Sequence, residues 1–287
     1  MKPAMRDRFG PFREEAESRG IPTGDVERWL AAARPCVTLT LTGDEAGPVV
    51  GRCGGPLLLP AGIPDPEHPF VASVDLAALP PDATDLPLPP DGHLLFFALP
   101  EPGTHQPMGR VVHVPAGTVV SQRDAGSWNT AHDDEYQALF ASYPQGPLRA
   151  IAGMSLPYHQ FVMPPGEREA GHLPGHPLSS ELVEVGEDIE DVTAHGGPLQ
   201  LGGYADEEAV EFDPVDIAAS IATRAVAAGH WDGPVSAHAA DWVLLADWYS
   251  GKHVRKREGS TVHWVIQRED LAARRFERVF TTVFWNP

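Results

Sequence analysis

Two aspartates, Asp75 and Asp247, are the residues best placed in the sequence to do chemistry together. Each ends an apolar segment, FVASVD at residues 70–75 and WVLLAD at residues 242–247, so the two occupy equivalent positions in similar blocks. A pair of carboxylates can act as general acid and general base. An aspartate that follows a strand also commonly caps the next turn, and we favour this structural role for both.

Three further side chains near these blocks are candidates for binding. Trp248 and Tyr249 follow Asp247 where a predicted strand meets its loop, so we expect both to be exposed and to suit a recognition surface. His263 lies in the next predicted strand. A cleft lined by Asp75, Asp247 and His263 would form a small-ligand site.

The sequence has no recognisable metal or cofactor pattern, and we expect neither. The glycine pairs at residues 54–55 and 196–197 are each followed by proline, which lacks the backbone N–H that a phosphate loop uses. They therefore predict tight turns with positive φ. His172 and His176 are four residues apart, but Pro174 between them argues against a helical metal site.

A catalytic nucleophile is also not evident, and the catalytic residues are left unassigned. There is no Gly-x-Ser-x-Gly motif. Cys53 would be reactive if a neighbour lowered its pKa, but a small buried thiol at a tight turn is the favoured interpretation. Cys36 is the only other cysteine, so free thiols in a cytoplasmic protein are expected, with a bridge between the two as the alternative.

Composition restricts the class of partner. The chain has 287 residues and a formal net charge of -19, which repels nucleic acid and anionic membranes and favours a basic protein partner. The basic run at residues 252–257 lies between two predicted strands and is interpreted as a solvated hairpin loop. No apolar run approaches the roughly 20 residues that span a bilayer, and no secretory signal is visible.

Periodicity predicts short helices and strands mixed without regular alternation, which indicates a β-rich α+β fold. Helical patterns occur at residues 11–19, 23–33, 132–143, 213–229 and 270–280. Strand patterns occur at residues 37–41, 70–74, 94–99, 110–114, 118–121, 242–248, 262–267 and 281–285.

The same order of blocks occurs twice in the chain. GGPLLL at residues 54–59 precedes residues 70–75 and GHLLFF at residues 92–97, and GGPLQL at residues 196–201 precedes residues 242–247 and TVHWVI at residues 261–266. We therefore expect two pseudo-repeated halves within one compact unit. The predicted segments are an N-terminal helical segment at 1–35, a first β-rich half at 36–145, an irregular acidic connector at 146–195 and a second β-rich half at 196–287.

These blocks resemble the YwqG-like family, bacterial domains of unknown function. The resemblance spans roughly residues 37–280 and is carried by an ordered set of motifs. They are GGPLLLPAG at 54–62, FVASVDL at 70–76, LP at 86–87, GHLLFF at 92–97, LGGY at 201–204, DWVLL at 241–245, VHWVI at 262–266, DL at 270–271 and Phe276. The resemblance implies an α+β fold with an internal repeat.

The chain departs from the family pattern at four places. Glutamines usual in YwqG-like sequences are replaced by Ser73, by Asp247 and by the segment at residues 208–211, and a tryptophan is replaced by Asp65. If those glutamines form a family site, this member has changed it. Ser73 and Asp247 therefore join Asp75, Trp248, Tyr249 and His263 as candidate binding residues.

Together these observations favour a soluble, non-enzymatic protein-binding module of the bacterial cytoplasm. An immunity or toxin-neutralising role fits, because an acidic surface suits a basic toxin domain and YwqG-like domains are similar to proteins found near toxin systems. The alternative is an enzyme or small-ligand-binding protein with a cleft between the two halves. An acidic face at residues 181–191 would favour the first, and a cleft with the paired carboxylates the second.

Overall fold

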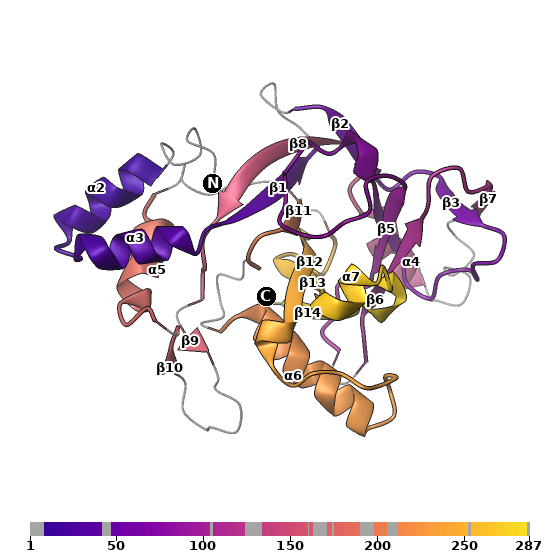
Figure 1. Cartoon of the computed structure of the whole chain (residues 1–287). Helices are drawn as coiled ribbons and strands as arrows, with labels where there is room; N and C mark the ends of the chain where they lie inside the picture. Colours follow the sequence, from indigo (N-terminus) through magenta and orange to yellow (C-terminus); the bar gives the residue numbers. More distant parts are fainter. Residues whose placement is uncertain are drawn as a thin grey trace.

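A computed structural model describes most of the chain (Figure 1). The described residues are 9–41, 47–103, 106–123, 134–159, 161–162, 171–173, 175–189, 198–205, 212–251 and 254–285. Within these ranges, no helix is both long and apolar enough to cross a membrane. The second glycine pair, the family position at residues 208–211 and part of the basic run at 252–257 lie outside the described residues.

A ten-stranded sheet forms the body of the protein, and every neighbouring pair in it is antiparallel. Its strands, in spatial order, are β14 (Phe280–Trp285), β13 (Ser260–Gln267), β12 (Trp242–Tyr249), β11 (Leu199–Gly202), β1 (Arg34–Thr40), β8 (Gly146–Ser155), β2 (Val49–Cys53), β4 (Phe70–Asp75), β5 (His93–Ala98) and β6 (Gly109–Val114). The β-rich α+β class predicted from the sequence is thereby confirmed.

The two outer strands of this sheet approach one another, so the sheet is nearly closed. The Met108 N–H, just before β6, donates to the Thr281 carbonyl of β14 at 3.0 Å. Inside, the Trp264 indole Nε1 donates to the Phe97 carbonyl at 3.2 Å, and the Trp264 and Phe96 rings lie 5.0 Å apart. Near closure removes most of the exposed edge on which another strand could pair.

Strand β12 is almost wholly apolar in sequence because both of its faces are buried. Val243 and Leu245 face the main core inside the sheet, whereas Trp242 and Leu244 face a second core beneath α6 (Pro214–Ala227). A strand covered on both faces needs apolar residues at successive positions. Helix α6 begins where expected, because the Asp213 carboxylate accepts from the Val215 N–H at 2.8 Å and proline occupies the first turn.

Three helices form a separate unit beside the sheet, α2 (Gly10–Ser18), α3 (Thr23–Ala31) and α5 (Ser179–Glu187) (Figure 1). They share a core of their own that includes Phe12, Trp29 and Leu182. The remaining described elements are α4 (Asp134–Ala141), α7 (Arg268–Ala272), the 3-10 helices η2 (Leu76–Ala78), η4 (Ala239–Asp241) and η5 (Phe276–Arg278), and the two-stranded sheets β3 (Leu57–Pro60) with β7 (Val120–Arg123) and β9 (Phe161–Val162) with β10 (Gly171–His172).

Regular elements occur within residues 146–195, the segment predicted as an irregular acidic connector. Strand β8 lies between β1 and β2 near the middle of the sheet, and α5 belongs to the helical unit. The turn prediction for the first glycine pair is confirmed, since Gly54 and Gly55 have φ values of 57° and 82°.

Candidate functional site

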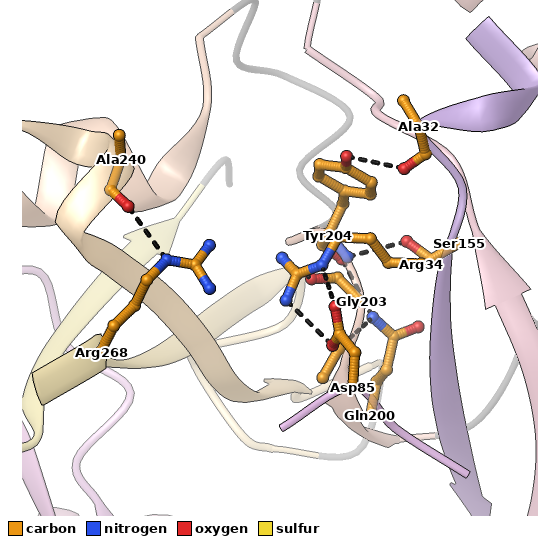
Figure 2. Close-up of polar contacts among 10 residues, drawn as sticks. Ala32, Arg34, Asp85, Ser155, Gln200, Gly203, Tyr204, Ala240 and Arg268 are labelled. Atoms are coloured by element: carbon orange, nitrogen blue, oxygen red, sulfur yellow. Dashed lines mark hydrogen bonds and ion pairs between the residues drawn. The ribbon is translucent and has the colours of Figure 1, made fainter. Parts of the chain in front are cut away.

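A pocket opens at the end of the sheet where β1 begins, β11 ends and β12 begins. The chain leaves β11 through Gly202 and Gly203, with φ values of 66° and 75°. A side chain at position 203 would place its Cβ 2.8 Å from that of Cys36, so only glycine fits there. This turn presents Tyr204, whose N–H donates to the Ser155 hydroxyl at 2.8 Å and whose hydroxyl donates to the Ala32 carbonyl at 2.9 Å (Figure 2).

Arg34 forms one wall of the pocket. Its guanidinium donates to both carboxylate oxygens of Asp85, from Nε at 2.8 Å and from one terminal nitrogen at 3.0 Å. The other terminal nitrogen donates to the Gly203 carbonyl at 3.0 Å. The Arg34 Cζ lies 5.4 Å from the centroid of the Tyr204 ring, within cation–π range. Three directions of contact therefore fix this guanidinium.

Arg268 forms the facing wall, immediately after β13. Its Nε donates to the Ala240 carbonyl at 2.9 Å, which leaves the two terminal nitrogens directed toward Arg34 (Figure 2). Among the described residues Arg268 has no carboxylate partner, and its side chain reaches solvent. Two guanidinium groups thus face each other across one pocket.

The pocket has a volume of about 260 Å³ and combines these arginines with an apolar lining. Val215, Trp242 and Leu244 are among the apolar residues that contribute to it. Asp213 also lines it, and its second carboxylate oxygen lies 3.6 Å from Nε2 of His159, a buried histidine. The carboxylate of Asp213 is already engaged by the first turn of α6 and by this imidazole.

Burial keeps three ionisable groups of the protein protonated at neutral pH. Burial raises the pKa of Tyr204 above its ordinary value, and the nearby Arg34 opposes that shift only in part, so the phenol stays protonated at neutral pH. Burial raises the pKa of both Cys36 and Cys53 to about 12, so neither thiol is an activated nucleophile. The described residues contain no group of three or more histidine, cysteine and carboxylate side chains that would hold a metal ion.

The candidates on the first half are placed on β4. The Asp75 carboxylate accepts from the Ala77 N–H at 3.0 Å and caps η2, which confirms its predicted capping role. Ser73 pairs in register with Arg52 of β2 and Leu95 of β5 and is partly buried.

The candidates on the second half lie on β12 and β13. Asp247 does not end its strand; it is buried within β12, directly opposite His263 of β13. The register aligns a row of five buried polar residues, one from each of β1, β11, β12, β13 and β14, namely Thr38, Gln200, Asp247, His263 and Thr282. The capping role predicted for Asp247 is therefore wrong, because β12 continues to Tyr249.

Trp248 was expected at the surface and is instead fully buried, with its ring 5.1 Å from that of Tyr143. The pairing register of β12 shifts between Leu244 and Ala246, so beyond this irregularity Ala246 and Trp248 point into the main core. Tyr249 is 51% exposed, as expected.

Asp75 and Asp247 do not lie on neighbouring strands, so adjacent strands do not form the expected cleft between them. Strands β4 and β12 are separated by four other strands, so Asp75 is adjacent neither to Asp247 nor to His263. On the side where the sheet nearly closes, the interior is filled by the buried rings of Phe96 and Trp264.

Gln200 connects the polar row to the pocket. Its Nε2 donates to the carbonyls of Gly202 at 3.1 Å and Tyr204 at 3.0 Å (Figure 2). Sequence reasoning assigned no role to Arg34, Arg268 or Gln200. The available signal was the LGGY block, in which a glycine pair stands directly before an aromatic residue, as at a turn that presents a side chain.

The helical unit presents a second candidate surface, which is acidic. Its segments 9–31 and 178–189 carry nine carboxylates and three arginines. Each arginine is paired within the unit: Arg13 with Glu27, Arg19 with Glu15 and Asp188, and Arg28 with Asp25. Four exposed glutamates have no ion-pair partner among the described residues: Glu14, Glu17, Glu181 and Glu184.

The structure defines a β-rich α+β domain with a pocket at one end of a nearly closed sheet. Residues 51–284 match the family described as Domain of unknown function (DUF1963). Because the match covers most of the 287 residues, the chain belongs to this family. No protein among those with curated descriptions matches the chain significantly.

Proposed function

We propose that the protein is a non-enzymatic binding module of the cytoplasm that recognises a basic protein through its acidic helical unit, α2, α3 and α5. The observation that carries this proposal is the charge arrangement of that unit. All three of its arginines are used internally, and Glu14, Glu17, Glu181 and Glu184 have no ion-pair partner within the part of the chain that the structure describes. An acidic surface of this kind accelerates encounter with a basic partner and disfavours other acidic proteins.

The shape of the unit supports the same role. Its apolar residues are collected in a separate core, so the outward positions of α2 and α5 are available for polar side chains. Glu14, Glu17, Glu181 and Glu184 occupy such positions. The overall charge of -19 gives the whole molecule a field of the same sign.

Charge neutralisation tests the proposal. The chain and its quadruple variant Glu14→Gln/Glu17→Gln/Glu181→Gln/Glu184→Gln are used as baits in extracts of the cells that make the protein. We expect the unmodified chain to retain a basic protein whose affinity, measured by calorimetry with the purified partner, falls about tenfold or more in the variant and at raised salt.

A matched control separates a site from bulk charge. The variant Glu67→Gln/Asp232→Gln/Glu269→Gln/Glu277→Gln removes the same number of charges from exposed positions elsewhere. It should retain the partner as the unmodified chain does. Equal loss in both variants, or retention of the same proteins by all three baits, would contradict recognition through the helical unit.

Two finer assignments accompany this proposal. Neutralisation of a basic toxin domain is the specific form of partner binding that the acidic unit supports. The ordered motifs support a place among YwqG-like members, and two pseudo-repeated halves are supported by the strand order, which reads β2, β4, β5, β6 on one side of the β1–β8 pair and β11, β12, β13, β14 on the other.

A further inference from the structure

Arg268 is a cation at the edge of the pocket in a strongly acidic protein. The chain has 40 acidic and 21 basic residues, yet no carboxylate pairs with this arginine among the described residues. Its Nε is held by the Ala240 carbonyl, so the guanidinium is oriented without being neutralised. A fixed guanidinium with both terminal nitrogens available matches the two oxygens of a carboxylate.

Two neighbouring pockets share Arg268, and only one suits an anion. The other, of about 450 Å³, is also lined by Asp241 and Glu269, whose charges repel anions. Its Ser236 hydroxyl is already hydrogen bonded to Asp241 at 2.5 Å. In the pocket of about 260 Å³, the group that faces Arg268 is the guanidinium of Arg34 (Figure 2).

The charges around the smaller pocket indicate a single negative charge on its ligand. Asp85 balances Arg34, and Asp213 is engaged by the first turn of α6 and lies beside His159. Arg268 alone stays uncompensated among the described groups. A dianion such as phosphate would bring a second negative charge close to Asp85 and Asp213, which repel it.

The rest of the lining is largely apolar, which favours a ligand whose uncharged part is apolar. Carbon surface that a ligand could reach comes from Ala239 and Ala240, with a small contribution from Val215. At about 30 Å³ for each water-sized group, a volume of about 260 Å³ holds roughly eight non-hydrogen atoms.

From this geometry we propose that the pocket binds a small organic monocarboxylate with an apolar body. The carboxylate accepts from the terminal nitrogens of Arg268 and from a remaining N–H of Arg34, and the apolar body lies against Val215, Ala239 and Ala240. The Tyr204 ring keeps Arg34 in place. This site is distinct from the acidic helical unit and does not depend on protein partner binding.

Calorimetric titration with hexanoate, which has eight non-hydrogen atoms, tests the inference. We expect one hexanoate per chain with a dissociation constant of about 1 mM or lower. Hexan-1-ol and inorganic phosphate, at matched ionic strength, should bind at least about tenfold more weakly, because one lacks the charge and the other lacks the apolar body. Phosphate that binds as tightly as hexanoate would overturn the assignment of ligand class.

Variants locate the site. Arg268→Gln should weaken hexanoate binding at least about tenfold. Arg268→Lys should weaken it less, because lysine keeps the positive charge but lacks the two parallel N–H donors of a guanidinium. Arg255→Gln, at another exposed arginine, should leave it unchanged. Circular dichroism and the melting temperature establish that each variant folds.

Two results would overturn the inference. One is the absence of saturable hexanoate binding up to about 20 mM. The other is equal hexanoate affinity in the unmodified chain and in a folded Arg268→Gln variant.

Discussion

Arg34 and Asp85 join the start of β1 to the loop between β4 and β5 through two parallel hydrogen bonds, 2.8 Å and 3.0 Å long. The residues are 51 positions apart, and no pattern in the sequence links them. Because both oxygens of Asp85 are used, Arg34 is held in one orientation toward the pocket. This ion pair therefore affects both the stability of the fold and the position of a candidate binding group.

Replacement of Asp85 by asparagine should lower the free energy of unfolding by about 1 kcal/mol. The pair is bidentate, but Asp85 is partly exposed, so solvent screens part of the attraction. Urea denaturation measures the change. Asp65→Asn is the control, since its single contact with Arg123 is 3.7 Å long and should contribute less than about 0.5 kcal/mol. Equal losses in the two variants would contradict a special role for the bidentate pair.

Replacement of Gly203 by alanine should destabilise the fold by about 2–4 kcal/mol. The residue has φ of 75°, and an added Cβ would meet the Cβ atoms of Cys36 at 2.8 Å and Ser155 at 2.9 Å. Gly117→Ala provides the comparison, because Gly117 has φ of 76° but nothing within 4 Å of the added Cβ. It should lose only the backbone cost of about 1 kcal/mol. Similar losses at both positions in urea titrations would argue that crowding at position 203 is unimportant.

Sequence periodicity was sufficient to predict a helix or a strand where one pattern dominates the segment. The apolar runs of β5 and β12 predicted strands, and Asp213 followed by proline predicted the start of α6. These signals are local, because burial on both faces and a capped first turn each require particular residue types within a few consecutive positions. The predicted domain boundaries stay a prediction.

The central strand β8 and the pocket could not be predicted in this way. Strand β8 contains two glycines, a proline and three alanine or serine residues, and its exposed and buried positions do not alternate regularly. Its strand conformation depends on pairing with β1 and β2, which lie far away in sequence. Arg34 and Arg268 are isolated arginines at element ends, and only the strand order brings them to the same pocket.

Replacement of Trp264 by phenylalanine should lower the free energy of unfolding by about 2–3 kcal/mol. The change removes the hydrogen bond to the Phe97 carbonyl and leaves a space beside Phe96 in a fully buried region. In Trp285→Phe the lost bond, to the Glu258 carbonyl, is of similar length but partly exposed, so less than about 1 kcal/mol should be lost. A Trp264→Phe variant no less stable than Trp285→Phe would show that this contact does not hold the near-closed sheet together.

The two buried thiols should make the protein less stable at alkaline pH. Burial raises the pKa of Cys36 and Cys53 from 9.0 to about 12, so each thiol keeps its proton in the folded state over a range where the unfolded chain releases it. Their contribution to stability is therefore complete below about pH 9 and is lost as pH rises toward 12. Linkage gives a loss of about 1.4 kcal/mol per pH unit for each thiol within this range.

Urea titrations of the unmodified chain and of Cys36→Ala/Cys53→Ala, at about pH 8 and about pH 10, measure this loss. Other alkaline titrations, such as that of the buried Tyr143, act on both proteins, so the difference between them isolates the thiols. The stability advantage of the unmodified chain over the variant should shrink by about 3 kcal/mol between the two pH values. An advantage that stays constant would mean that the thiols ionise in the folded state as easily as in the unfolded chain, which their complete burial opposes.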